Sequence, residues 1–229
     1  MFFLTGSEAA ALLTFDDGRL DQYTNAFPTL TKYGVAGTFY IHTASLGMSV
    51  VQMQEMYAAG NDMGNHTVDH VQTDGLSLVD ATAEFAGCKT ALDGWGMPRA
   101  SSHVAYPYGR YGGYVLQAMA AAGMKTGRTC VQDLITMASI HDSYTPYQIP
   151  IGYVFLATSL AMCKSWLDVA KVQGRTIVFL FHTIIDTPTV EYQWATADLD
   201  ALIAYGQSIG IPFLTITQWW ANYTAKYGG

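Results

Sequence analysis

Two adjacent carboxylates close the first apolar run of the chain. Residues 11–18 read Ala-Leu-Leu-Thr-Phe-Asp-Asp-Gly, which puts Asp16 and Asp17 where a strand would end. Each carboxylate raises the pKa of the other unless a cation or a shared proton compensates their charge. Successive strand residues face opposite sides until the backbone turns at Gly18, so one carboxylate can face a metal ion and the other a substrate. An ordinary Asx turn is the alternative explanation of Asp-Asp-Gly.

Two histidines four residues apart form the second polar group, in His66-Thr-Val-Asp-His70. This spacing aligns two side chains on one face of a helical turn, as in the zinc-binding His-Glu-x-x-His helix, although no glutamate lies between them here. Asp17, His66 and His70 together make a two-histidine, one-carboxylate set, which suits zinc with open positions and also non-haem iron. The ligand set alone does not choose the metal, and two unrelated surface histidines are the alternative.

A third histidine, His182, follows the apolar run 176–181, which is typical of a strand buried on both faces. Its imidazole is either a hydrogen-bonded core group or an acid/base group at the tip of the strand. Pro107-Tyr108-Gly109 is either an ordinary turn or a source of backbone amides for an oxyanion hole. Leu180 is by default a core residue. The other histidines are expected to be structural or surface residues: His42, His103 and His141.

Short apolar runs alternate with stretches of helical period, which indicates an α/β fold with a parallel sheet and helices packed outside it. The pattern predicts strands at 10–15, 36–41, 61–65, 102–106, 126–130, 147–151, 176–181 and 212–215. It predicts helices at 21–33, 50–59, 78–92, 113–122, 159–172 and 196–209, several of them with a cap such as Ser49 or Ser77.

The predicted elements place the polar groups on one rim. Active sites of parallel α/β barrels lie at the carboxyl ends of the strands. The aspartate pair ends the first predicted strand, the histidine pair follows the third, Pro107-Tyr108-Gly109 follows the fourth, and His182 ends the seventh. We therefore expect these groups to meet in one site.

Length and composition limit the class of protein. A chain of 229 residues with half of them apolar fits one domain, residues 1–229, with no boundary or linker in it. Charged residues make up 13%, the net charge is -7 and no Lys or Arg run occurs, so nucleic acid is not an expected partner. The longest apolar stretch, 149–163, is too short for a membrane span. The start of the chain has no basic n-region and no full h-region, so no signal peptide is visible.

The three cysteines, Cys88, Cys130 and Cys163, are widely spaced. No Cys-x-x-Cys pair occurs, which excludes a zinc finger and leaves room for one disulfide. Aromatic residues make up 13% of the chain, with Tyr the commonest. Some of these rings are candidates for platforms on which sugar rings stack.

Four ordered motifs resemble those of the polysaccharide deacetylase family, also known as the NodB homology domain or carbohydrate esterase family 4. They are Thr14-Phe-Asp-Asp-Gly18, His66-Thr-x-x-His70, Ala105-Tyr-Pro-Tyr-Gly109 and Leu180-Phe-His182, and Ala36-Gly-Thr-Phe-Tyr40 is similar to the family's second strand. The resemblance implies a distorted, incomplete (β/α) barrel. It also implies a metal-dependent hydrolase that removes acetyl groups from an acetylated polysaccharide or oligosaccharide.

The resemblance implies a role for each matching residue. Asp17, His66 and His70 would bind one divalent metal ion, most often Zn²⁺, with Co²⁺ or Ni²⁺ as alternatives. Asp16 would be the general base and His182 the general acid. The amide of Tyr108, after Pro107, would help to hold the oxyanion, and Leu180 would line the pocket for the acetyl methyl group.

The sequence departs from the family pattern at two places. Members often carry an arginine two residues before the proline of the third motif, held against the catalytic aspartate, and this chain has Ala105 there. We expect Arg110 or Arg19 to orient Asp16 instead. The aspartate of the fourth motif, which supports the acid histidine, is not recognisable; the candidates are Asp133 and Asp142.

The expected substrates are polymers of N-acetylglucosamine, such as chitin or peptidoglycan, or O-acetylated xylan. Such substrates would place the protein outside the cell or in the cell envelope. The alternatives are a hydrolase of non-peptide C–N bonds in a small cyclic amide and a non-catalytic sugar-binding module. An iron-dependent oxygenase shares only the ligand types, and the βα periodicity argues against it.

Overall fold

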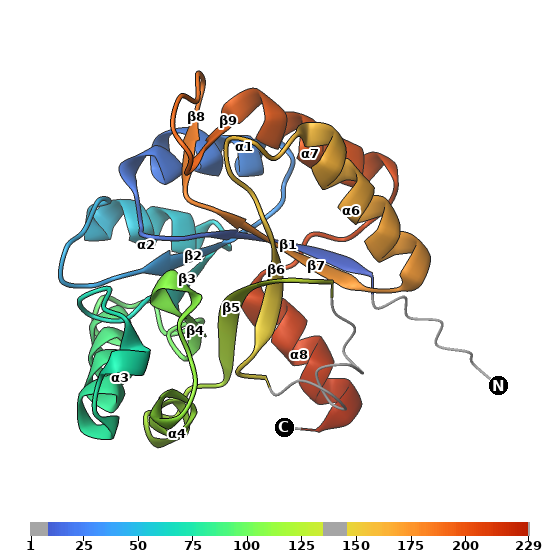
Figure 1. Ribbon diagram of the computed structural model, residues 1–229. Coiled ribbons are helices and arrows are strands. Elements are labelled where there is room, and N and C mark those ends of the chain that lie inside the picture. Colours follow the sequence, from blue (N-terminus) through green and yellow to red (C-terminus); the bar gives the residue numbers. More distant parts are fainter. Residues whose placement is uncertain (1–8, 135–145, 229) are drawn as a thin grey trace.

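The centre of the molecule is a closed barrel of seven parallel strands, seen in a computed structural model that describes residues 9–134 and 146–228 (Figure 1). The strands follow one another around the barrel in chain order, and β7 pairs with β1. Their bounds are β1 Ala10–Phe15, β2 Thr38–Ile41, β3 Asp62–Asn65, β4 His103–Ala105, β5 Thr126–Gln132, β6 Ile149–Tyr153 and β7 Thr176–Phe181. This confirms the predicted α/β fold and the expected incomplete (β/α) barrel.

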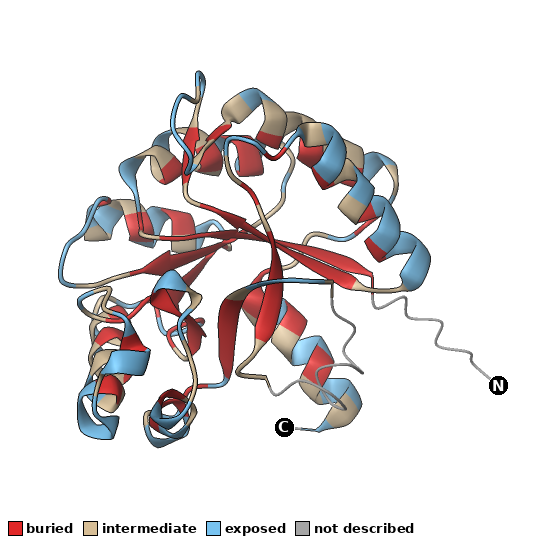
Figure 2. Ribbon diagram, viewed as in Figure 1, coloured by how far each residue is buried: buried red, intermediate tan, exposed pale blue. Residues whose placement is uncertain are grey.

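Helices surround the barrel. The barrel strands are almost entirely buried except at the end of β5, whereas the helices are buried mainly on the side that faces the strands (Figure 2). The helices are α1 Phe27–Lys32, α2 Val50–Ala58, α3 Leu78–Gly94, α4 Tyr114–Ala121, α6 Leu160–Gln173, α7 Thr196–Ser208 and α8 Ile216–Tyr227. Three single turns complete them: the π-helical η1 Gln22–Ala26 and the 3-10 turns η2 Thr73–Gly75 and η3 Pro107–Gly109. Ser49 caps α2 in a capping box, as its position predicted.

The alternation of strand side chains divides the core into an inner and an outer part. Leu12, Val178 and Leu180 belong to one buried cluster together with Trp219 of α8. Their neighbours along β1 and β7, such as Leu13 and Phe179, belong to a larger cluster that includes residues of α1, α2, α6 and α7. Both faces of these strands are therefore apolar, which explains their continuous hydrophobic runs.

Helix α8 covers the amino ends of the strands. The backbone amide of Ile216 donates to Thr38, and Thr217 hydrogen-bonds to Asp62, so the first residues of β2 and β3 hold the start of the helix. The indole of Trp219 donates to Thr176, the first residue of β7. The carboxyl ends of the strands lie at the opposite end of the barrel.

The structure corrects two predicted elements and adds three that were not predicted. Residues 212–215 do not form an eighth strand but a single bridge between Phe213 and Ala11, because β1 pairs with β2 only at Thr14 and Phe15 and leaves its start open to this segment. The predicted helix 21–33 begins as the π-helix η1. The prediction also missed α8 and the short parallel pair β8 Thr183–Ile185 and β9 Gln193–Ala195. No helix within the described residues is long and apolar enough to cross a membrane.

Candidate metal and catalytic site

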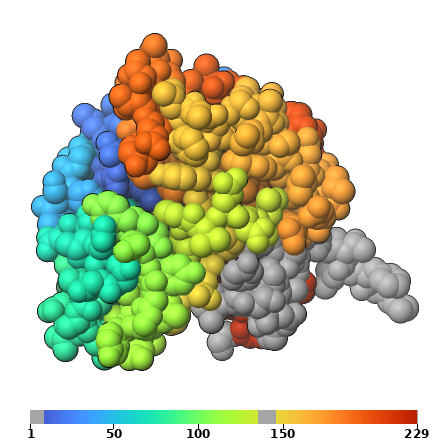
Figure 3. Space-filling view, viewed as in Figure 1, coloured from blue at the N-terminus to red at the C-terminus, as the bar shows by residue number. Residues whose placement is uncertain are grey.

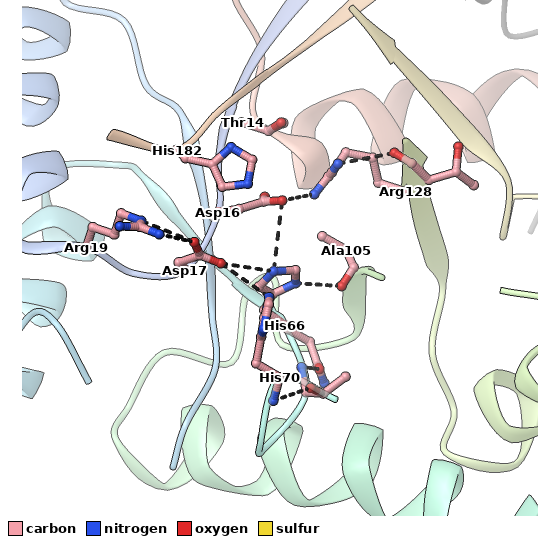
Figure 4. Close-up of polar contacts among 12 residues, drawn as sticks. Thr14, Asp16, Asp17, Arg19, His66, His70, Ala105, Arg128 and His182 are labelled. Carbon is pink, nitrogen blue, oxygen red and sulfur yellow. Dashed lines mark hydrogen bonds and ion pairs between the residues drawn. The ribbon is translucent and has the colours of Figure 1, made fainter. Parts of the chain in front are cut away.

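Asp17, His66 and His70 converge at the carboxyl end of the barrel (Figure 4). The Nε2 atoms of His66 and His70 lie 3.5 Å and 3.4 Å from the same carboxylate oxygen, Oδ1 of Asp17. One ligand atom from each residue falls within 4.8 Å of the other two. The three side chains predicted to bind a metal ion are thus brought together.

The histidine pair lies in a loop, not on a helical turn as its spacing predicted. Thr67 and His70 both have left-handed backbone conformations, with φ of 68° and 56°. The Asn65 side chain accepts a hydrogen bond from the Thr67 amide (3.0 Å), and the Thr67 hydroxyl accepts one from the His70 amide (3.1 Å). Left-handed conformations cost energy for residues other than glycine and cluster at functional sites, and here they turn both imidazoles toward Asp17.

A backbone carbonyl fixes the orientation of the His66 ring. Its Nδ1 lies 2.7 Å from the carbonyl oxygen of Ala105, and the His66 side chain is only 2% exposed. In this arrangement Nδ1 carries the proton and donates, so the lone pair of Nε2 faces Asp17. Metal-binding histidines use the same kind of contact to set their tautomer.

Arg19 binds the other oxygen of the Asp17 carboxylate. Its Nε and Nη2 atoms donate to Oδ2 over 3.1 Å and 2.9 Å, which leaves Oδ1 to the two histidines. Burial raises the pKa of Asp17, but the neighbouring His66, His182 and Arg19 together outweigh burial and hold that pKa well below its ordinary value. Asp17 is therefore an anion at any physiological pH, as a metal ligand must be.

The donor set fits a divalent cation. Two ligand atoms about 2.05 Å from a tetrahedral zinc ion lie about 3.3 Å apart, close to the separations between Asp17 Oδ1 and the two imidazole nitrogens. Burial is the main cause that lowers the pKa of His70 to about 4, so this ring is neutral at pH 7 and able to bind a metal. Two imidazoles and one carboxylate leave further coordination positions for water and substrate.

The second aspartate, Asp16, forms a buried ion pair with Arg128 of β5. The Arg128 guanidinium donates to Oδ2 of Asp16, and the two residues are 0% and 4% exposed. The guanidinium carbon also lies 5.4 Å from the centre of the Tyr40 ring, a cation–π distance. Burial lowers the pKa of Arg128, but Asp16 and the other neighbouring groups together outweigh burial and raise that pKa above its ordinary value, so the arginine remains charged. Oδ1 of Asp16 has no hydrogen-bond partner among the described residues.

Arg128 corrects the expectation that Arg19 or Arg110 orients Asp16. Arg19 binds Asp17, and Arg110 forms an ion pair with Asp74 at 3.1 Å. Arg128 stands directly opposite Ala105 in the ladder between β4 and β5. The cation that the family pattern places at position 105 thus comes from the neighbouring strand. An arginine inside a predicted strand was the sign in the sequence that pointed to it.

His182 lies above Asp16 in the same site (Figure 4). Its ring stands beside Tyr192 and Tyr153, with ring centres 5.1 Å and 6.1 Å away. Burial lowers the pKa of His182, although the negative charges of Asp16 and Asp17 act in the opposite direction. Nδ1 of His182 is buried and has no hydrogen-bond partner in the described parts of the chain.

Neither aspartate proposed to support His182 is seen in that role. Asp133 is exposed, its carboxylate accepts a hydrogen bond from the Leu134 amide, and it lines a separate small hollow near Trp166. Asp142 lies outside the described residues, as does His141.

A hollow of about 440 Å³ contains this group of residues. Its wall includes the metal-site triad and Asp16, Arg19, Cys130 and His182, together with three tyrosines, Tyr108, Tyr153 and Tyr192. These segments, far apart in the sequence, meet on the face shown in Figure 3, where blue, green and orange parts of the chain adjoin. Tyr153, Tyr192 and Cys130 were not predicted as site residues.

The remaining predicted site residues take different places around the hollow. Tyr108 is 61% exposed, has φ 58°, and its ring lies 4.9 Å from that of His70. Pro107 begins η3 and is buried beneath it. Leu180 is fully buried among apolar residues of the barrel interior and is not part of the wall of the hollow.

The other histidines and the cysteines take no part in the triad. His42 is half-buried beside His70 and lines a neighbouring hollow on the far side of Asp17. His103 is buried and hydrogen-bonds to Thr126, as expected of a structural residue. Cys88, Cys130 and Cys163 are free thiols, so the disulfide considered from the sequence is not formed.

The chain resembles known proteins along most of its length. The family model for polysaccharide deacetylases matches residues 4–127. YxkH of Bacillus subtilis (strain 168), assigned by name to the polysaccharide deacetylases, is 35% identical over 54% of this chain and 45% of its own. The poly-β-1,6-N-acetyl-D-glucosamine N-deacetylase of Staphylococcus epidermidis is 28% identical over 67% of this chain and 57% of its own. The chain thus spans about half the length of these curated relatives.

A solved structure of a deacetylase is also similar to this chain. The deacetylase PplD of Streptococcus pyogenes, determined in complex with acetate, superimposes with a TM-score of 0.54 and 30% sequence identity, covering 61% of this chain and 63% of PplD. The matched family model extends over more than half of the residues and includes the aspartate pair and the histidine pair. The chain belongs to the polysaccharide deacetylase family.

Proposed function

We propose that this protein is a metal-dependent hydrolase that removes acetyl groups from an acetylated glycan, with the whole chain acting as one catalytic domain. The observation that carries the proposal is that two functional sets of side chains line the same hollow. One set is the triad Asp17, His66 and His70, suited to a cation, and the other is the pair Asp16 and His182, suited to proton transfer.

The triad would hold one divalent cation, most often zinc, with Co²⁺ or Ni²⁺ as alternatives. Such an ion polarises an acetyl carbonyl and lowers the pKa of a water molecule, which lets a carboxylate take the proton of that water at neutral pH. Arg19 keeps Oδ2 of Asp17 occupied, so the ligand presents a single oxygen to the cation.

Asp16 is the general base. Arg128 holds one of its oxygens inside the barrel, while the other has no hydrogen-bond partner among the described residues and can accept the proton of the attacking water. A fixed carboxylate with one free oxygen is the arrangement that general-base catalysis requires.

His182 is the general acid. It lies in the same hollow as Asp16 and, once protonated, gives its proton to the leaving sugar nitrogen or oxygen so that acetate departs. The backbone amide of Tyr108, at the left-handed residue of η3, stabilises the oxyanion, and such a donor typically contributes about 3 kcal/mol. Pro107 fixes the start of this turn. Leu180, expected from the family resemblance to line the acetyl pocket, lies instead in the apolar core outside the wall of the hollow.

The substrate is a glycan that contains N-acetylglucosamine, in preference to acetylated xylan. The named activity of the Staphylococcus epidermidis relative supports this choice. Exposed rings of Tyr108 and Tyr192 in the wall of the hollow suit the apolar faces of sugar rings. A glycan of this kind places the protein outside the cell or in the cell envelope.

Acetate release tests the proposal. The purified protein is incubated with chitooligosaccharides, poly-β-1,6-N-acetylglucosamine, peptidoglycan and acetylxylan, with and without a chelator, and then with Zn²⁺, Co²⁺ or Ni²⁺ restored. We expect acetate from at least one N-acetylglucosamine polymer, loss of that activity with the chelator, and its return with the metal. Acetate release that the chelator leaves unchanged would contradict the metal role. Hydrolysis of a cyclic amide with no action on any glycan would show that the substrate is a cyclic amide and not a glycan.

A further inference from the structure

The strands that carry the general base and the general acid lose their backbone pairing at the site. The last pair between β1 and β7 joins Phe15 and Phe181, and the Asp16 amide still donates to the Phe181 carbonyl over 2.9 Å. The chain then turns away at Asp17, which has a left-handed φ of 75°. The carbonyl oxygens of Asp16 and His182 therefore need partners from outside the ladder.

One side chain supplies both partners. Gln22 is fully buried, and its Nε2 donates to the Asp16 carbonyl over 2.5 Å and to the His182 carbonyl over 2.8 Å. A primary amide has two N–H groups, so it can serve both oxygens at once. Gln22 thus joins the end of β1 to the end of β7 where the strands themselves no longer do.

The π-helix that begins with Gln22 binds the same segment at two further points. Asp21, just before it, accepts a hydrogen bond from the Ile184 amide over 2.8 Å. Asn25 donates to the Ile184 carbonyl over 2.7 Å. Short π-helical turns are rare and occur mostly at functional sites. In this chain η1 and the residue before it present three side chains to the backbone of residues 182–184.

The general acid depends on this attachment more than the general base does. The Asp16 side chain is held by Arg128, so its position has a second support. The His182 ring has no hydrogen bond at Nδ1 within the described residues, and the rings of Tyr192 and Tyr153 stand beside it. The direction of its imidazole is therefore set largely by its backbone.

We propose that Gln22 is a positioning residue that sets the spacing between the general base and the general acid, and that it acts mainly through His182. This inference rests on the proposed function. Among the described residues Gln22 is not in the wall of the hollow, and its side chain hydrogen-bonds the two carbonyls and not the side chains of the metal triad, so its effect is on the proton transfer to the leaving group.

The test replaces Gln22 by Met, which has a similar shape and no N–H donor. Two substrates are compared: an N-acetylated chitooligosaccharide, whose amine must be protonated to leave, and 4-nitrophenyl acetate, whose phenolate leaves without a proton. We expect kcat on the amide to fall about 100-fold with little change in KM, because small misplacements of a catalytic group cost about this much. The aryl ester should lose less than about 3-fold, since it does not need the acid.

A matched control separates positioning from general stability. Asn61 is also a buried amide, and it hydrogen-bonds the Met56 carbonyl and the Gly37 amide at the amino ends of the strands, away from the site. Asn61→Leu should lose stability without changing the ratio of amide to ester activity. Gln22→Asn, whose amide is too short to reach both carbonyls, should change that ratio in the same direction as Gln22→Met and tests the inference if Gln22→Met does not fold.

A double-mutant cycle and a spectroscopic readout complete the test. In a His182→Ala background, Gln22→Met should cost no further amide activity, because both changes remove the same step. The ¹⁵N resonances of the His182 ring should shift in Gln22→Met and stay in place in Asn61→Leu, and this readout needs no turnover. Unchanged His182 resonances, or additive losses in the cycle, would overturn the inference. A wild-type protein that releases no acetate from any glycan would count only against the proposed function.

Discussion

Arg128 binds the Asp16 carboxylate inside the barrel, and it does so from the position directly opposite Ala105 in the β4–β5 ladder. Both side chains are almost completely buried, so each charge depends on the other for its stability. Ala105 keeps a different role through its backbone, because its carbonyl holds Nδ1 of His66. Strand β5 thus holds the general base through Arg128, and the neighbouring strand β4 holds the metal site through the Ala105 carbonyl.

Removing the arginine should damage both stability and turnover. Arg128→Met leaves the Asp16 carboxylate buried without a partner, which typically costs about 3–5 kcal/mol of unfolding free energy. Acetate release per folded molecule should fall by about 100-fold or more, because a protonated or displaced carboxylate is a poor base. Urea unfolding and acetate assays at several pH values measure the two effects.

Arg99→Met is the control for that variant. Arg99 forms an ion pair with the buried carboxylate of Asp62 at 2.7 Å, at the opposite end of the barrel from the site. This variant should lose stability and keep its turnover per folded molecule. Equal losses of turnover in the two variants would count against a specific role of Arg128.

Metal binding should stabilise the protein through the triad alone. The purified protein should bind one Zn²⁺ per chain, and its melting temperature should fall when a chelator removes the ion, because a ligand that binds only the folded state stabilises it. His66→Ala should abolish both the binding and the melting shift. His42→Ala should keep both, since His42 lies beside His70 but outside the triad. Zinc binding by His66→Ala equal to that of the wild type would refute the assignment of the ligands.

Gly109 should be irreplaceable because of its neighbour as well as its conformation. Its φ is +67°, and a Cβ added there would lie 2.6 Å from Cβ of Cys130. Gly123 has nearly the same φ, +68°, with nothing within 4 Å of an added Cβ. Gly123→Ala should therefore cost about 1 kcal/mol for the left-handed backbone.

Gly109→Ala should cost clearly more stability than Gly123→Ala, and it should also move Tyr108 and lower acetate release. Urea unfolding and initial rates of the two variants provide the comparison. Similar behaviour of both would mean that the contact with Cys130 does not constrain this turn.

The buried His103 should make stability fall in mild acid. Burial lowers the pKa of His103 to about 4 from its ordinary 6.5, so the unfolded chain binds more protons than the folded one between these values. The contribution of neutral His103 to the free energy of unfolding is complete above the pKa of the unfolded chain and is lost as the pH falls toward the pKa of the folded protein. The loss amounts to about 2 kcal/mol between pH about 7.5 and about 5. His103→Asn can keep the hydrogen bond to Thr126 and does not titrate. Its unfolding free energy should fall less over that pH range, and an identical fall would show that His103 is protonated in the folded state.

The sequence predicted the elements that are long and periodic. The barrel strands from β1 to β7 and the helices α2, α3, α4, α6 and α7 follow from apolar runs and caps close to their observed bounds. Residues 212–215 looked like another strand because they are apolar, but they only fill the open start of β1. Helix α8 was missed although its buried residues Ile216, Trp219 and Tyr223 recur at helical spacing and Thr215 caps its start.

The metal triad and the aspartate pair could be predicted because their residue types and spacing are specific. Arg128 and Gln22 could not be assigned in the same way, since the contact of Arg128 with Asp16 and that of Gln22 with the His182 carbonyl join residues far apart in the sequence that only the closed barrel brings together. Arg19 was a reasonable candidate for Asp16, but it follows the turn at Gly18 and reaches Asp17 instead. Pairings of this kind depend on tertiary structure and not on local pattern.

The division of labour between the two adjacent aspartates is tested most directly by measuring zinc content and acetate release together in Asp16→Asn and Asp17→Asn. Asp16→Asn should keep one zinc ion per chain and lose acetate release by about 1000-fold, because the base is gone while the three ligands remain. Asp17→Asn should lose both the zinc and the activity. Acetate release near the wild-type rate in Asp16→Asn, or full zinc content in Asp17→Asn, would contradict the assignment of Asp16 as base and Asp17 as metal ligand.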